Sequence, residues 1–64
     1  MDDQRLVRDA LAAGVRRWGL KQEASDDLLK AFINRDYSRY NEIEAALITF
    51  GRVDPNLAGK IVGR

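Results

Sequence analysis

The sequence predicts an all-α fold, a compact bundle of three main helices plus a short C-terminal helix. Two observations carry this prediction. Apolar side chains recur every three or four residues, which is the spacing of one face of an α-helix, and Gly, Asn and an Asp-Pro pair separate the periodic segments. No segment alternates apolar and polar residues between hairpin turns, so we expect no β-sheet.

The first predicted helix runs from Asp2 to Trp18. Acidic residues at its start and basic residues at its end suit the helix dipole, and Gly19 supplies the stop. Large side chains at helical spacing form its predicted core face: Val7, Leu11, Val15 and Trp18. A second, weaker stripe lies beside this face and contains small residues that would let another helix approach closely: Leu6, Ala10, Ala13 and Arg17.

The second predicted helix runs from Gln22 to Ile33, with two apolar pairs at a spacing of four residues: Leu28 with Phe32, and Leu29 with Ile33. Ser25 could cap a later start, but we expect the helix to begin before it. A short break follows, in which Asn34 is expected to adopt the left-handed conformation that ends a helix.

The third predicted helix runs from Tyr37 to about Phe50, is capped by Asp36 and ends at Gly51. Its core stripe is Tyr40, Ile43, Leu47 and Phe50. Asp54 as N-cap and Pro55 at the first helical position start a fourth helix, which we expect to reach Val62. Leu57 and Ile61 are predicted to face inward, and Val53 is expected to pack on Leu57 or Ala58 as a hydrophobic staple.

The 64 residues allow one domain, residues 1–64, whose core is marginal at this size. The chain lacks Cys and His, so disulfides and the usual transition-metal ligands are absent, and oligomerisation is the remaining common source of stability. The formal net charge is +1, which argues against a strongly basic nucleic-acid binder. An acidic start and short apolar runs predict a cytoplasmic protein with no signal peptide and no membrane span.

The sequence predicts no enzyme. Without His, the commonest general base is missing, and Ser25 beside Asp26 is typical of a helix start. Adjacent carboxylates point away from each other around a helix. A calcium loop beginning at Asn34 fails because its sixth and twelfth positions hold Arg39 and Ala45. We therefore expect no metal, no cofactor and no small-molecule substrate.

Two hypotheses remain for the function. The first is a protein–protein interaction module, a regulator or inhibitor whose partner is another protein or a second copy of this chain. It rests on apolar residues beside the predicted core faces: Leu6, Ala10, Ala13, Tyr37 and Ile48. The alternative for these residues is that they complete a wide core.

The second hypothesis is a helix-turn-helix DNA-binding regulator, with the third helix as recognition helix. Its buried positions would be Leu29, Ile33, Tyr40 and Ile43. Its DNA-contacting residues would be Arg35, Tyr37, Arg39 and Asn41. The pattern departs from this motif because Asn34 replaces the turn Gly and Lys30 replaces a small residue. Glu42 and Glu44 would also oppose phosphate.

Overall fold

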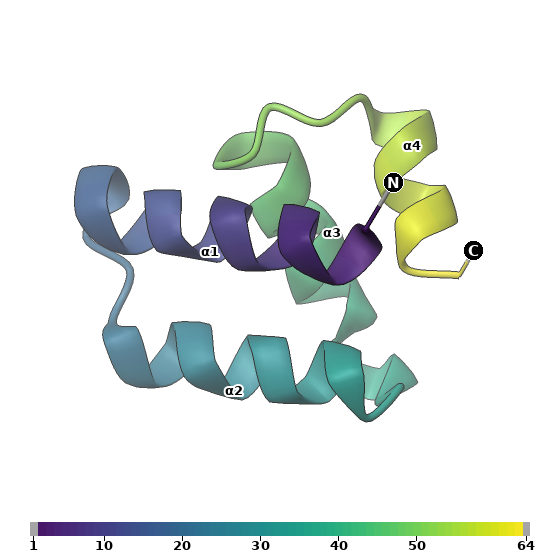
Figure 1. Ribbon diagram of the computed structural model, residues 1–64, viewed down its shortest axis with the longest axis horizontal. Coiled ribbons are helices and arrows are strands. Elements are labelled where there is room, and N and C mark those ends of the chain that lie inside the picture. Colours follow the sequence, from purple (N-terminus) through teal and green to yellow (C-terminus); the bar gives the residue numbers. More distant parts are fainter. Residues whose placement is uncertain (1, 64) are drawn as a thin grey trace.

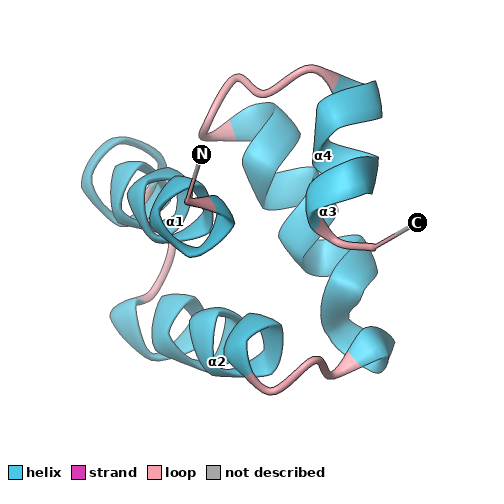
Figure 2. Cartoon of the chain, turned by 45° about the vertical axis from the view of Figure 1, so that its right-hand side comes forward, coloured by secondary structure: helices cyan, strands magenta, loops and turns pink. Residues whose placement is uncertain are grey.

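The computed structural model describes residues 2–63, and within them the chain forms four α-helices, one short 3-10 helix and no strand. α1 (Asp3–Trp18) and α2 (Gln22–Ile33) run side by side in opposite directions, and α3 (Tyr40–Thr49) is steeply inclined to both (Figure 1). Figure 2 looks nearly along α1 and α2 and shows α3 and α4 (Pro55–Ile61) beside them. The predicted all-α bundle is confirmed.

The ends of α1 follow from its capping residues. The Asp2 carboxylate accepts hydrogen bonds from the backbone N–H groups of Gln4 and Arg5, so Asp2 is the N-cap and the helix begins one residue later than predicted. Gly19 ends the helix with a φ of 74°, the left-handed conformation that Gly adopts without strain. The predicted stop at Gly19 is confirmed.

The bounds predicted for α2 are confirmed, including the start before Ser25, which lies inside the helix and is 6% exposed. One detail of the prediction is wrong. The left-handed residue is Arg35, with a φ of 58°, whereas Asn34 has a φ of −84°. The N–H groups of Arg35 and Asp36 donate hydrogen bonds to the carbonyls of Phe32 and Ala31. This hydrogen-bonded turn at the end of the helix places the left-handed residue at Arg35, one position after Asn34.

The third predicted helix is divided into two parts. Tyr37–Arg39 form a 3-10 helix, η1, and α3 begins at Tyr40. The predicted Asp36 cap is confirmed, since its carboxylate accepts a hydrogen bond of 3.1 Å from the Ser38 N–H. η1 is one turn long, as is usual where a 3-10 helix leads into an α-helix.

α4 starts as predicted: the Asp54 carboxylate accepts hydrogen bonds from the N–H groups of Asn56 and Leu57. The inward placement of Leu57 is wrong, because this residue is 38% exposed. The buried face of α4 is instead centred on Ala58, which is fully buried, with Ile61 and Val62 beside it. Leu57 lies on the flank of that face.

The core lies where α1, α2, α3 and α4 meet, and its largest fully buried side chains are Tyr40, Leu11, Ile43, Leu47, Val7 and Val62. One predicted core residue, Trp18, is 58% exposed, because α1 extends past the core at this end. α1 and α3 approach closely. A Cβ at Gly14 would lie 2.6 Å from the Phe50 ring, so any side chain at this position would force the ring to move.

Candidate functional site

Two aromatic side chains are exposed, and they belong to opposite ends of the molecule. Trp18 is 58% exposed at the C-terminal end of α1, and Tyr37 is 69% exposed in η1, which follows α2. In Figure 1 these two segments lie at the left and right ends of the longest axis. Large exposed apolar rings are common in binding surfaces, so each end is a candidate site.

The small-residue stripe of α1 is used by the chain itself. Ala10 is 2% exposed and belongs to the core, and a Cβ at Gly51 would lie 2.9 Å from its methyl group. Leu6 packs, partly buried, against the core, and Ala13 is half-buried. The close approach expected at this stripe therefore occurs with the segment that follows α3. Ala10 is not accessible to a partner.

Tyr37, Asn41 and Ile48 are exposed along η1 and α3. Two glycines of the C-terminal segment lie close to residues of this stretch. A Cβ at Gly59 would lie 3.6 Å from the Glu44 carboxylate, and one at Gly63 would lie 3.9 Å from the Tyr37 ring. We call this surface the α3–α4 face, and it consists of Tyr37, Asn41, Ile48, Gly59 and Gly63.

The Tyr37 ring packs against the ring of Tyr40. Its centroid lies 4.8 Å from that of Tyr40 in an edge-to-face contact, a favourable aromatic geometry. Tyr40 is only 2% exposed and also contacts Phe32, with the ring centroids 6.3 Å apart. The Tyr40 hydroxyl is buried and has no hydrogen-bond partner in the described part of the chain. Tyr37 is thus an exposed ring on a rigid support.

The charges around Tyr37 largely compensate one another. Arg39 donates hydrogen bonds of 3.0 and 3.2 Å to the two carboxylate oxygens of Glu42, and these bonds raise the pKa of Arg39 above its usual value. Hydrogen bonds from the Ser38 hydroxyl and N–H lower the pKa of Asp36. The guanidinium of Arg35 lies 5.8 Å from the centre of the Phe32 ring, within cation–π range.

These contacts bear on the four residues that the DNA hypothesis assigned to base or phosphate contact. Arg39 is engaged with Glu42, and Arg35 lies in the turn before η1. Tyr37 and Asn41 are exposed. Ile33, which a helix-turn-helix would bury, is 49% exposed.

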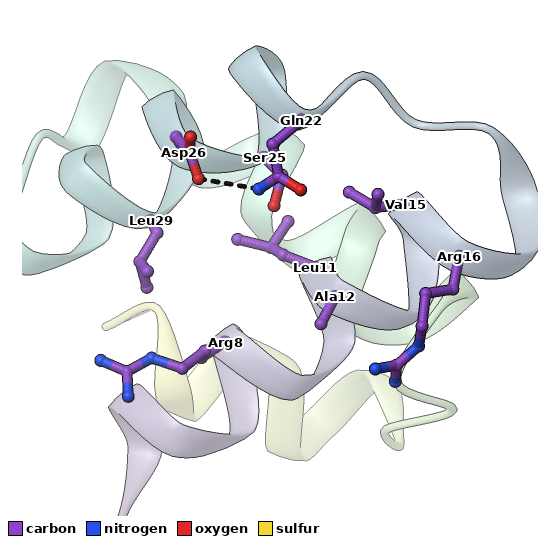
Figure 3. A pocket seen from close by; sticks show the side chains of 9 residues that line it. All are labelled: Arg8, Leu11, Ala12, Val15, Arg16, Gln22, Ser25, Asp26 and Leu29. Carbon is purple, nitrogen blue, oxygen red and sulfur yellow. Dashed lines mark hydrogen bonds between the residues drawn. The ribbon is translucent and has the colours of Figure 1, made fainter.

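Sequence reasoning did not anticipate an open groove of about 380 Å³ between α1 and α2 (Figure 3). Leu11 and Ser25 are its most buried residues. Arg8 and Arg16 belong to its α1 side, and the Gln22 amide donates a 3.0 Å hydrogen bond to Asp26 on its α2 side. The signal for it was present, because Arg8, Ala12 and Arg16 follow one another at four-residue steps along α1. Its floor therefore combines an apolar and a hydroxyl side chain, and its rim is charged.

The Trp18 end has a different composition. The Trp18 and Phe50 rings lie 6.2 Å apart with an angle of 31° between their planes, and Phe50 is only partly buried. Three exposed basic side chains lie close to Trp18 in the sequence: Arg16, Arg17 and Lys21. We call the pair of rings the Trp18 platform. Sequence reasoning missed it because Trp18 was assigned to the core.

Comparison with known proteins gives no assignment: no family model, no curated protein and no solved structure matches this chain. Within residues 2–63, no three acidic side chains lie together in a group that could hold a metal ion. No helix in that part of the chain is long and apolar enough to cross a membrane. The functional hypotheses therefore rest on the geometry of the two ends.

Proposed function

We propose that this chain is a non-catalytic protein–protein interaction module that docks another protein, or a second copy of itself, through its α3–α4 face. One observation carries the proposal: Tyr37 is 69% exposed although its ring is fixed against the buried Tyr40. Tyr is enriched among the residues that dominate binding energy at interfaces. A ring that is already ordered loses little side-chain entropy on binding.

The surroundings of Tyr37 support an apolar contact. Ile48 adds a second exposed apolar side chain on the same face, and the glycines of the α4 border leave room for a partner's backbone or side chains. Arg39 and Glu42 already neutralise each other, so burying this region would leave fewer isolated charges without water. The chain lacks His and Cys, two common catalytic residues. We therefore propose that it regulates or inhibits its partner by occupying the partner's surface and not by catalysis.

The helix-turn-helix hypothesis is less well supported by the same geometry. To contact a base, Arg39 would have to break its hydrogen bonds with Glu42. The carboxylates of Asp36 and Glu42 would also approach the DNA phosphates, which carry the same sign of charge. Duplex DNA is therefore the competing outcome in the test. Salt-sensitive binding to random duplex that Arg39→Ala weakens would replace the present proposal.

The test compares two double variants that each remove two exposed apolar side chains. Tyr37→Ala with Ile48→Ser changes the α3–α4 face, whereas Ile33→Ser with Leu57→Ala removes side chains of similar exposure outside it. Circular dichroism first establishes that both variants are folded. The binding of each is then measured by sedimentation and by pull-down from the host lysate.

We expect the unmodified chain to form a dimer or to recover a stoichiometric partner. The Tyr37/Ile48 variant should bind at least about tenfold more weakly, as the loss of one interface anchor predicts, and the Ile33/Leu57 variant should bind normally. A strict monomer that recovers no protein would overturn the proposal, as would equal losses in the two variants.

A further inference from the structure

The groove between α1 and α2 is open because short side chains line it from both helices. Ala12 on α1 and Ser25 on α2 leave a space of about 380 Å³ (Figure 3). Leu11 is only 1% exposed, whereas Val15 and Leu29 are half-buried and also line the groove. Apolar side chains from both helices therefore remain open to solvent here.

The two sides of the groove carry opposite charge. Arg8 and Arg16 line it from α1, and Asp26 lines it from α2 (Figure 3). All three side chains are exposed, and none of them forms an ion pair within residues 2–63. The Asp26 carboxylate accepts its 3.0 Å hydrogen bond from Gln22 of the same helix. Each side therefore offers its charge to an occupant of the groove.

The spacing of these charges limits what the occupant can be. Arg8 and Arg16 are eight residues apart on α1, which is about 12 Å along the helix axis. A segment that runs along the groove meets both guanidinium groups on one side and the Asp26 carboxylate on the other. An occupant with charge of a single sign on both its sides would be repelled by one side of the groove.

The walls of the groove favour a helix over an extended strand. Both walls are α-helices, whose backbone N–H and C=O groups are bonded within each helix. An extended strand would place its own backbone polar groups against Val15 and Leu29 without partners, which is costly. A helix satisfies its backbone internally and presents a ridge of side chains that fits between two neighbouring helices.

We propose that the α1–α2 groove docks an amphipathic helix of another protein, with an apolar ridge, acidic residues on one side and a basic residue on the other. Two acidic residues about two turns apart contact Arg8 and Arg16, and the basic residue contacts Asp26. The apolar ridge covers Val15 and Leu29. This surface differs from the α3–α4 face, so the proposal goes beyond the proposed function.

Three labelled peptides test the charge pattern by fluorescence polarisation at low salt. Each has about 20 residues, because shorter helices are marginal in water, and all share one ridge of leucine and alanine. The mixed peptide has glutamate on one side of the ridge and lysine on the other. The second peptide has glutamate on both sides, and the third has lysine on both. Circular dichroism establishes that the three have equal helix content.

We expect the mixed peptide to bind most tightly, about threefold more than the glutamate peptide and about tenfold more than the lysine peptide, as a few exposed charge contacts predict. The chain itself has a formal charge of +1, so net charge alone would favour the glutamate peptide. Tightest binding of the glutamate peptide, or equal binding of all three, would overturn the proposal.

Asp26→Asn tests the α2 side of the groove. This change removes the negative charge and keeps a side chain of the same size, so the glutamate peptide should then bind at least as tightly as the mixed peptide. An unchanged preference for the mixed peptide would overturn the contact with Asp26 and with it the proposal.

Two double variants with equal charge changes test the α1 side. Arg8→Ala with Arg16→Ala should weaken binding of the mixed peptide about three- to tenfold, as the loss of two exposed ion pairs predicts. Arg17→Ala with Lys60→Ala removes the same charge at exposed positions that do not line the groove and should bind normally. Equal losses in the two variants would overturn the proposal, because the effect would then reflect net charge alone.

Two further measurements separate this site from the α3–α4 face and from other occupants. Tyr37→Ala with Ile48→Ser should bind the mixed peptide normally, so failure of one proposal is distinguishable from failure of the other. A dimer of the chain that the mixed peptide dissociates would assign the groove to a second copy and overturn the proposal. Displacement of the mixed peptide by decanoate at equal concentration would assign the groove to small anionic amphiphiles and also overturn it.

Discussion

The two ends of the molecule both expose an aromatic ring, but they differ in how the ring is supported and what surrounds it. Tyr37 rests on the buried Tyr40 among charges that are already paired. Trp18 rests on the partly buried Phe50, and its nearest charged residues in the sequence, Arg16, Arg17 and Lys21, form no ion pair within residues 2–63. The difference teaches that exposure alone does not define a ligand class, because the support and the local charge decide what an exposed ring can bind.

The largest effect should come from removing a supporting ring. Phe50→Ala leaves Trp18 and Gly14 without their neighbour, and we expect a loss of about 2–3 kcal/mol in the free energy of unfolding, below the full cost for a buried Phe. Tyr37→Ala removes a ring that is mostly in water and should cost less than about 1 kcal/mol. Urea denaturation followed by circular dichroism measures both. Equal losses would mean that the two rings have the same structural role.

The next effect concerns the support of Tyr37 and has the opposite sign. Because the Tyr40 hydroxyl is buried without a hydrogen-bond partner in residues 2–63, Tyr40→Phe should raise stability by about 1 kcal/mol. For a domain of this size, that corresponds to a rise in Tm of about 4–8 °C. Tyr37→Phe, at an exposed hydroxyl, should leave Tm nearly unchanged. A lower Tm for Tyr40→Phe would show that the hydroxyl is bonded, for example to a buried water molecule.

The smallest effect is a pH dependence at the Tyr37 end. The Ser38 hydroxyl lowers the pKa of Asp36, so this carboxylate stabilises the fold above its ordinary pKa of 3.8, and the contribution is lost as the pH falls through the lowered pKa. Ser38→Ala should move the pKa of Asp36 up towards 3.8, whereas Ser38→Thr should keep it low. Titration of the Asp36 carboxyl carbon by NMR measures the shift. An unchanged pKa in Ser38→Ala would show that the backbone bond alone sustains it.

Local signals were enough to predict most of the helix bounds. Asp2, Gly19 and the Asp54-Pro55 pair act on neighbouring backbone groups, so their effect can be read from a few adjacent residues. The break after α2 was also found, but its left-handed residue was placed one position early. The sequence could not show whether Asn34 or Arg35 is the left-handed residue. That choice depends on which carbonyls accept hydrogen bonds from the N–H groups of Arg35 and Asp36, and this is settled only when the turn has formed.

Burial at the edges of the core could not be predicted in the same way. Trp18 and Leu57 have the helical spacing of core residues, yet Trp18 is exposed where α1 extends past the core and Leu57 is exposed on the flank of the buried face of α4. The same uncertainty affected the candidate sites. Tyr37 and Ile48 are on the surface as the interaction hypothesis requires, whereas Ala10 is covered by the segment after α3. Periodicity gives the face of a helix, but only the packed neighbours decide whether that face is covered.

The glycine at position 14 also has a consequence for how the chain folds. Gly in the interior of a helix disfavours helix formation by about 1 kcal/mol relative to Ala, so the C-terminal half of α1 is weakened when the helix stands alone. That cost is offset only when Phe50, from the far end of α3, packs into the space that the missing side chain leaves. Formation of α1 is thereby coupled to closure of the chain around it. A separated N-terminal segment should be a poor helix, and the intact chain should fold in one cooperative step.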